Sequence, residues 1–104
     1  MSYAIAIVRY RRPLDDVIAN TDDHRAYPRE LQAKGILLVS GPFDPRNGGA
    51  LILRVPDDNR AAALDAIRDG DPFYQRGIAQ YELMAWNPVI GLEELDKLGM
   101  VKTG

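Results

Sequence analysis

The nine residues 69–77 constrain the fold of this chain more than any other segment does. Gly70 suits the left-handed backbone conformation that often ends a helix. Asp71 directly precedes Pro72, whose fixed φ and missing amide hydrogen suit the first position of a helix, so the pair predicts an N-cap and a new helical turn. A buried strand is then expected over 78–86. The segment therefore predicts a helix end, a carboxylate held in one place and the last strand of a sheet.

Apolar periodicity and breaker residues predict the other elements. In chain order, we expect a strand over 3–10, a helix over 14–34 that breaks and restarts at 20–23, strands over 36–40 and 50–55, and a helix over 59–68. Gly41-Pro42 should bend the chain after the second strand, and Asp57-Asp58 should cap the second long helix. Pro28 lies inside the first helix, where its missing amide hydrogen predicts a mild kink. A short helix over 92–98 and a frayed end over 99–104 complete the expected chain.

The order strand–helix–strand–strand–helix–strand matches the ferredoxin-like split βαβ arrangement. We therefore predict an α+β fold in which a four-stranded antiparallel sheet carries both helices on one face, with a short C-terminal helix appended. The expected domain covers 1–88, and residues 89–104 form a C-terminal extension. Along 78–86, Tyr81 should point to one face of the sheet, whereas Met84 and Trp86 should point to the other.

The second face of this sheet has no predicted cover from the chain itself, although the strands carry apolar residues on both faces. A second copy of the chain is the simplest cover, because closed two-fold dimers are the commonest assemblies. We therefore expect a homodimer, or a higher even oligomer, of dimeric α+β barrel type. A wet ligand cavity is the alternative cover for this face.

Composition excludes several classes of function. The net charge of −2 gives no basic footprint for nucleic acid, and no apolar run approaches the length of a membrane span. The chain has no cysteine, which excludes thiolate catalysis, and its single histidine disfavours a zinc site. No glycine-rich loop of the dinucleotide-binding type is present. We expect no metal, no cofactor, no nucleic-acid or membrane partner, and a cytoplasmic location.

The single histidine, His24, and the positioned carboxylate of Asp71 are the candidate chemical groups. General acid–base catalysis needs a group that titrates near neutral pH and a partner that orients it. His24 could instead be a surface residue bonded to Asp22, and Asp71 could be a plain helix cap. One carboxylate rarely serves well in both roles, so the capping and catalytic interpretations compete. The hydroxyl of Ser40 could bond either to the backbone or to a substrate.

Several short features occur in a fixed order along residues 3–86: His24 in a helix, Leu31 and Gly35 at its end, Ser40-Gly41-Pro42 after a buried strand, Asp71-Pro72-Phe73 and Gly77, and a strand that ends in Trp86. Their joint order and spacing resemble the YCII-related family, small proteins of the dimeric ferredoxin-like class. Pro28 departs from that pattern, since the family usually has an aliphatic residue there.

The resemblance implies a histidine–aspartate pair in a pocket beside the sheet, which maps onto His24 and Asp71. Relatives include dehydrochlorinase-type enzymes of aromatic breakdown and, more distantly, muconolactone isomerases. The leading hypothesis is a small cofactor-free enzyme of lyase or isomerase type that acts on a small cyclic or aromatic-derived substrate. The residues expected to contact this small-molecule ligand are Ser40, Gly41, Pro42, Phe73 and Trp86. The alternatives are a non-catalytic small-ligand-binding or assembly module and a cofactor-independent monooxygenase.

Overall fold

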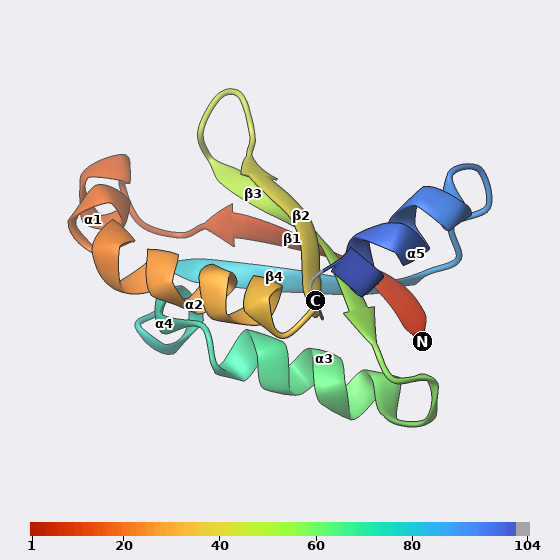
Figure 1. The fold of residues 1–104 in the computed structure, drawn as a ribbon. Helices are drawn as coiled ribbons and strands as arrows, with labels where there is room; N and C mark the ends of the chain where they lie inside the picture. The colour runs from red at the N-terminus through yellow and green to blue at the C-terminus, as the bar shows by residue number, and fades with distance from the viewer. Residues whose placement is uncertain (102–104) are drawn as a thin grey trace.

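The computed structural model describes the backbone of residues 1–101 and the side chains of 1–99 (Figure 1). The elements, in chain order, are β1 (Ser2–Tyr10), α1 (Leu14–Ala19), α2 (Thr21–Ala33), β2 (Leu37–Pro42), β3 (Gly48–Val55), the 3-10 turn η1 (Asp57–Asn59), α3 (Arg60–Asp69), α4 (Pro72–Gln75), β4 (Ala79–Trp86) and α5 (Leu92–Val101). No helix in this part of the chain is long and apolar enough to cross a membrane.

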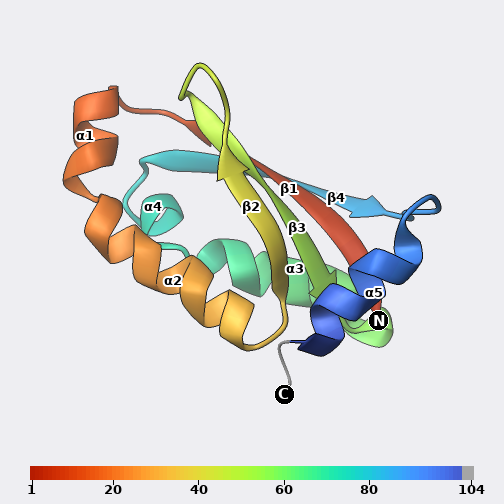
Figure 2. The same cartoon turned by 45° about the horizontal axis from the view of Figure 1, so that its top comes forward.

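The four strands form one antiparallel sheet in the order β2-β3-β1-β4, so β1 and β3 are central and β2 and β4 are edges. α2 and α3 lie side by side against one face of this sheet, which Figure 2 shows from a second direction. The predicted ferredoxin-like α+β fold is therefore confirmed.

The main hydrophobic core lies between the sheet and these two helices. Ala4 and Ala6 of β1 are fully buried, and their small side chains let the helices approach the centre of the sheet. Leu53 of β3 lies opposite Ala4 and is also fully buried, so its truncation to alanine should cost about 2–5 kcal/mol. A second cluster joins α1 and α4 to the sheet and consists of Val8, Val17, Phe73, Ile78 and Ala79.

The predicted break in the first helical segment falls at Asn20, between α1 and α2. The side chain of Asn20 does not cap α2; its amide donates to the carbonyl of Asp16 at 2.8 Å, and its oxygen accepts from Arg76 at 2.8 Å. α2 then continues past Pro28 to Ala33. Proline has no amide hydrogen to offer the carbonyl of His24 one turn earlier, so the helix is locally weaker just after the histidine.

Two local predictions are wrong. Gly41-Pro42 do not bend the chain away from the sheet but continue β2, paired with Ala50 and Gly49 of β3. Proline is tolerated there because β2 is an edge strand, where a missing donor need not break the ladder. Asp57 does not cap α3 through its side chain; its carboxylate instead accepts a hydrogen bond from the hydroxyl of Ser2.

The second sheet face is partly covered by α5, contrary to the prediction that the chain leaves this face uncovered. The hydroxyl of Tyr3 donates to Asp96 of α5, and Tyr3 is buried. A Cβ on Gly99 would clash with the guanidinium of Arg54, which shows how closely α5 approaches β3. α5 also runs on to Val101, so the end of the chain does not fray from residue 99 as predicted; residues 102–104 lie outside the described part.

Candidate active site

Asp71 occupies the turn between α3 and α4 and is the one charged residue among the fully buried side chains in the described part of the chain. Its Oδ1 accepts a hydrogen bond from the amide of Phe73 at 2.9 Å, and Pro72 takes the first helical position. The predicted N-cap is therefore confirmed. The cap fixes the carboxylate, because the backbone of Asp71 is extended and its side chain is hydrogen-bonded to the first turn of α4.

His24 and Asp71, which are 47 positions apart in sequence, meet in the folded chain. Nδ1 of His24 lies 2.9 Å from Oδ1 of Asp71, and His24 is bonded to this carboxylate rather than to Asp22. Pairing with His24 does not exclude the helix cap, because the same oxygen accepts from both the Phe73 amide and the imidazole. A carboxylate oxygen has enough lone-pair capacity for two donors.

The other carboxylate oxygen of Asp71 is taken by Tyr81. Tyr81 projects from β4 toward the helices, and its hydroxyl donates to Oδ2 of Asp71. Burial, followed by the negative charge of Asp71, raises the pKa of Tyr81 well above the ordinary phenol value. The phenol therefore keeps its proton and remains a donor at neutral pH. Together, Phe73, His24 and Tyr81 provide three donors to a carboxylate that has no contact with solvent.

The ring of His24 is held by stacking as well as by its hydrogen bond. Phe73 lies parallel to it, with 3.9 Å between ring centroids and 9° between the planes. Tyr10 and Phe73 form a T-shaped pair, with 6.1 Å between ring centroids and 83° between the planes. Donation from Nδ1 to the carboxylate leaves Nε2 as the unprotonated nitrogen of neutral imidazole. Among the side chains of residues 1–99, none hydrogen-bonds to Nε2.

Tyr27 ties α2 to the end of α3 and so aligns the elements that carry His24 and Asp71. Its hydroxyl donates to the carbonyl of Ile67 at 2.7 Å, and burial, more than the nearby charge of Asp71, raises its pKa. The prediction that Gly70 adopts a left-handed conformation is wrong, since its φ is −80°. Glycine is needed there for space, because a Cβ would lie 2.7 Å from the Tyr27 hydroxyl.

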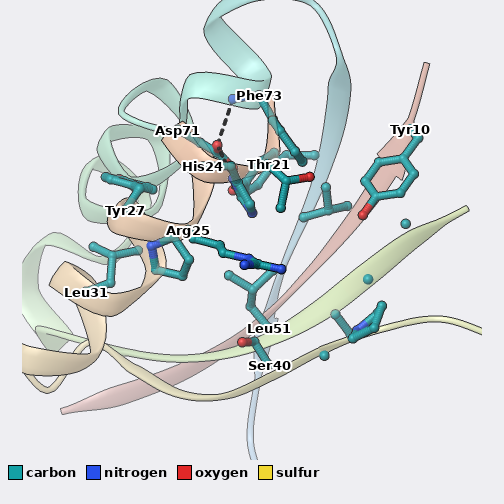
Figure 3. Close-up of a pocket in the computed structure, with 18 of the residues that line it drawn as sticks. Tyr10, Thr21, His24, Arg25, Tyr27, Leu31, Ser40, Leu51, Asp71 and Phe73 are labelled. Atoms are coloured by element: carbon teal, nitrogen blue, oxygen red, sulfur yellow. Dashed lines mark hydrogen bonds and ion pairs between the residues drawn. The ribbon is translucent and has the colours of Figure 1, made fainter. Parts of the chain in front are cut away.

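A cavity of about 410 Å³ opens beside the His24–Asp71 pair, between α2 and the β2–β3 hairpin (Figure 3). It is bordered by six of the seven predicted site residues: His24, Ser40, Gly41, Pro42, Asp71 and Phe73. Trp86 does not border it; it pairs with Tyr3 at the far end of β4. The expectation for Trp86 is wrong because an odd number of steps separates it from Tyr81, which places the two on opposite sheet faces.

The YCII-related domain model matches residues 1–87. The chain belongs to the YCII-related family. A solved structure with the same fold is 5-chloro-2-hydroxyhydroquinone dehydrochlorinase from Burkholderia phenoliruptrix AC1100, in complex with 2,5-dihydroxybenzoquinone. The two chains superpose with a TM-score of 0.67 and are 24% identical, over 84% of this chain and 96% of the dehydrochlorinase. No curated protein matches the sequence.

The YCII-related span includes every residue that borders the cavity, whereas α5 follows it. The cavity residues that sequence reasoning does not assign include Tyr10, Thr21, Arg25, Arg46 and Tyr81. Tyr81 carries a readable signal, because a tyrosine at a core-facing strand position needs a partner for its hydroxyl. Within the described residues, no group of three or more His, Asp or Glu side chains is arranged to hold a metal ion.

Proposed function

We propose that this YCII-related protein is an enzyme of lyase or isomerase type that moves a proton on a small cyclic or aromatic-derived substrate. The observation that carries the proposal is the 2.9 Å contact between Nδ1 of His24 and the buried carboxylate of Asp71, at the wall of a cavity large enough for one ring. A base oriented by a carboxylate and open on its other nitrogen is the arrangement that acid–base catalysis requires.

In the proposed reaction, Nε2 of His24 accepts a proton from a carbon or hydroxyl group of the substrate. The imidazolium that forms is stabilised by Asp71, whose position is already fixed by Phe73 and Tyr81. In an isomerisation, the same nitrogen returns the proton to a different atom of the ring. In an elimination, the electron pair released by deprotonation moves through the ring, and the leaving group departs with the electrons of its bond.

The dehydrochlorinase with the same fold suggests the substrate class. Its name describes an enzyme that acts on a chlorinated hydroquinone. At 24% identity, this likeness supports a shared fold but does not identify a shared substrate. The substrate class of this chain is therefore part of the proposal. Ser40 and Gly41, on the edge strand β2, offer a hydroxyl and backbone groups to the substrate, and Phe73 and Pro42 offer apolar surface.

We also propose that two copies pair through the part of the second sheet face that α5 leaves open. Val39 and Met84 are 49% and 39% exposed there, and Ile5, Ile7 and Ile52 are only partly buried. An apolar patch of this kind on a soluble chain favours association, and stable interfaces bury about 1,600 Å² in total. Sedimentation at micromolar concentration should give twice the mass of one chain, and a monomer would contradict the dimer.

A substrate screen with the wild-type protein and His24→Gln tests the enzymatic proposal. The screen should contain lactones and halogenated ring diols, with loss of substrate and release of halide as readouts. For a compound that is turned over, His24→Gln should lower kcat by about 10²-fold or more while circular dichroism stays unchanged. Equal turnover by both proteins would overturn the role of His24. Ligand binding without turnover across the screen would favour the non-catalytic binding module.

A further inference from the structure

Two arginines line the cavity on the side of β2 and of the hairpin that follows it: Arg25 from α2 and Arg46 from the β2–β3 connection. In Figure 3, the side chain of Arg25 extends from α2 into the cavity, which Leu51 and Ser40 also line. Arg25 also borders the neighbouring groove between α2 and β2, which places it on the β2 side of the helix. His24 and Asp71 occupy the side of α4.

The charge that lines this cavity is opposite in sign to that of the chain. Among the side chains of residues 1–99, neither Arg25 nor Arg46 forms an ion pair or a side-chain hydrogen bond. Asp71 is the one carboxylate among the lining residues, and both of its oxygens are already bonded. The cavity therefore has two uncompensated cations in a protein of net charge −2. A concave site lined in this way concentrates anions.

We propose that Arg25 and Arg46 form an anion-binding subsite that takes a planar group with one negative charge shared by two oxygens, such as a ring carboxylate. A guanidinium presents parallel N–H donors that match two such oxygens. Ser40 adds a hydroxyl on the same side of the cavity. This inference rests on the proposed function, because it orients the anionic end of the substrate toward β2 and its reacting end toward His24.

The test compares two probes that differ in charge at one substituent, 2,5-dihydroxybenzoate and its neutral amide 2,5-dihydroxybenzamide. Their binding to the full chain is measured by titration calorimetry at neutral pH and low salt. The wild-type protein should bind the carboxylate at least about 10-fold more tightly than the amide, and Arg25→Gln or Arg46→Gln should remove most of that preference without changing amide binding. Arg29→Gln is the matched control, since it removes the same charge from α2 outside this cavity.

Equal binding of the two probes by the wild-type protein, absence of binding by both, or an equal effect of Arg25→Gln and Arg29→Gln would each overturn the subsite. The measurement needs no turnover, so its outcome is separate from that of the enzymatic proposal. A carboxylate preference that depends on Arg25 in a protein without turnover would support the subsite and reject the enzyme. Turnover could instead depend on His24 and stay unchanged in Arg25→Gln and Arg46→Gln, with equal binding of the two probes. That result would support the enzyme and reject the subsite.

Discussion

The hydroxyl of Tyr81 donates to the one carboxylate oxygen of Asp71 that neither the helix cap nor His24 uses. Asp71 is thus fully bonded although it is completely buried. A buried carboxylate with an unused oxygen would lose the hydration that water gives it. Tyr81 therefore keeps Asp71 in the position where it can serve His24, and this makes it a positioning residue of the proposed site.

Tyr81→Phe should lower the free energy of unfolding by about 1–3 kcal/mol, because it leaves Oδ2 of Asp71 buried without a donor. Urea unfolding at neutral pH measures this loss. Tyr74→Phe is a suitable control, since the hydroxyl of Tyr74 makes no side-chain hydrogen bond within residues 1–99. A loss below about 0.5 kcal/mol for Tyr81→Phe would mean that water replaces the phenol.

The stability of the protein should fall as the pH rises above about 10. The folded state raises the pKa of Tyr81 by burial and by the charge of Asp71, so the native chain holds the phenol proton after the unfolded chain has lost it. The stabilising contribution is complete below the unfolded pKa and is lost progressively above it. Urea midpoints between about pH 8 and 11 should show this slope, and Tyr81→Phe should reduce it. Tyr27, whose pKa is also raised, should account for part of the remaining slope.

Gly70→Ala should destabilise the protein by about 1–3 kcal/mol, because the new methyl group would lie 2.7 Å from the Tyr27 hydroxyl. The ring cannot withdraw freely, since that hydroxyl is bonded to the carbonyl of Ile67. Gly41→Ala is the matched control, as a Cβ at that position would have no atom within 4 Å. In a double-mutant cycle, Tyr27→Phe should recover part of the loss at position 70, and strict additivity would show that the clash is absent.

Local features of this site can be predicted from sequence, and contacts between distant elements cannot. The N-cap at Asp71 is predicted from the Asp71-Pro72 pair alone, and the structure confirms it. Sequence reasoning assigns Gly70 a helix-ending conformation because glycine commonly has that role, whereas its real constraint comes from Tyr27 on another helix. The pairing of His24 with Asp71 depends on the packing of α2 against the α3–α4 turn, which spacing along the chain does not encode, so only the family resemblance predicts it.

The misplacement of Trp86 has a different cause, since strand alternation alone assigns it to the same face as Met84 and away from Tyr81. The ligand-contact prediction nevertheless groups it with the cavity, and the period of β4 contradicts that grouping. Arg25 escapes sequence reasoning because it lies one residue beyond the His24 stripe on α2. It shares a face with Thr21 and Pro28, and only the position of β2 makes that face part of the cavity.

Removal of residues 89–104 tests the predicted domain boundary. The YCII-related span ends at residue 87, and every cavity residue precedes it, so the shortened chain should keep its fold and its cavity. It should be less stable than the full chain, because Tyr3 would lose Asp96 and the cover of α5. Circular dichroism and thermal unfolding measure both properties. Loss of all native secondary structure at room temperature would show that α5 belongs to the domain.

Asp71→Asn separates the role of the aspartate as a cap from its role as the partner of His24. Asparagine caps helices about as well as aspartate, so this variant should lose much less stability than Asp71→Ala. Because the oxygen that caps the helix also accepts from Nδ1 of His24, the neutral ring should keep its proton on Nδ1, whereas the imidazolium form loses its counter-charge. Nitrogen NMR of the single histidine reads the tautomer without any need for turnover.

For a compound that the wild-type protein converts, Asp71→Asn should lower kcat by about 10²-fold or more, because the imidazolium that forms on His24 lacks the counter-charge of Asp71. Phe73, which stacks on the ring, should still hold the imidazole in place. An unchanged tautomer together with an unchanged kcat would show that Asp71 supports the fold alone. A changed tautomer with unchanged kcat would show that His24 binds the substrate without transferring its proton.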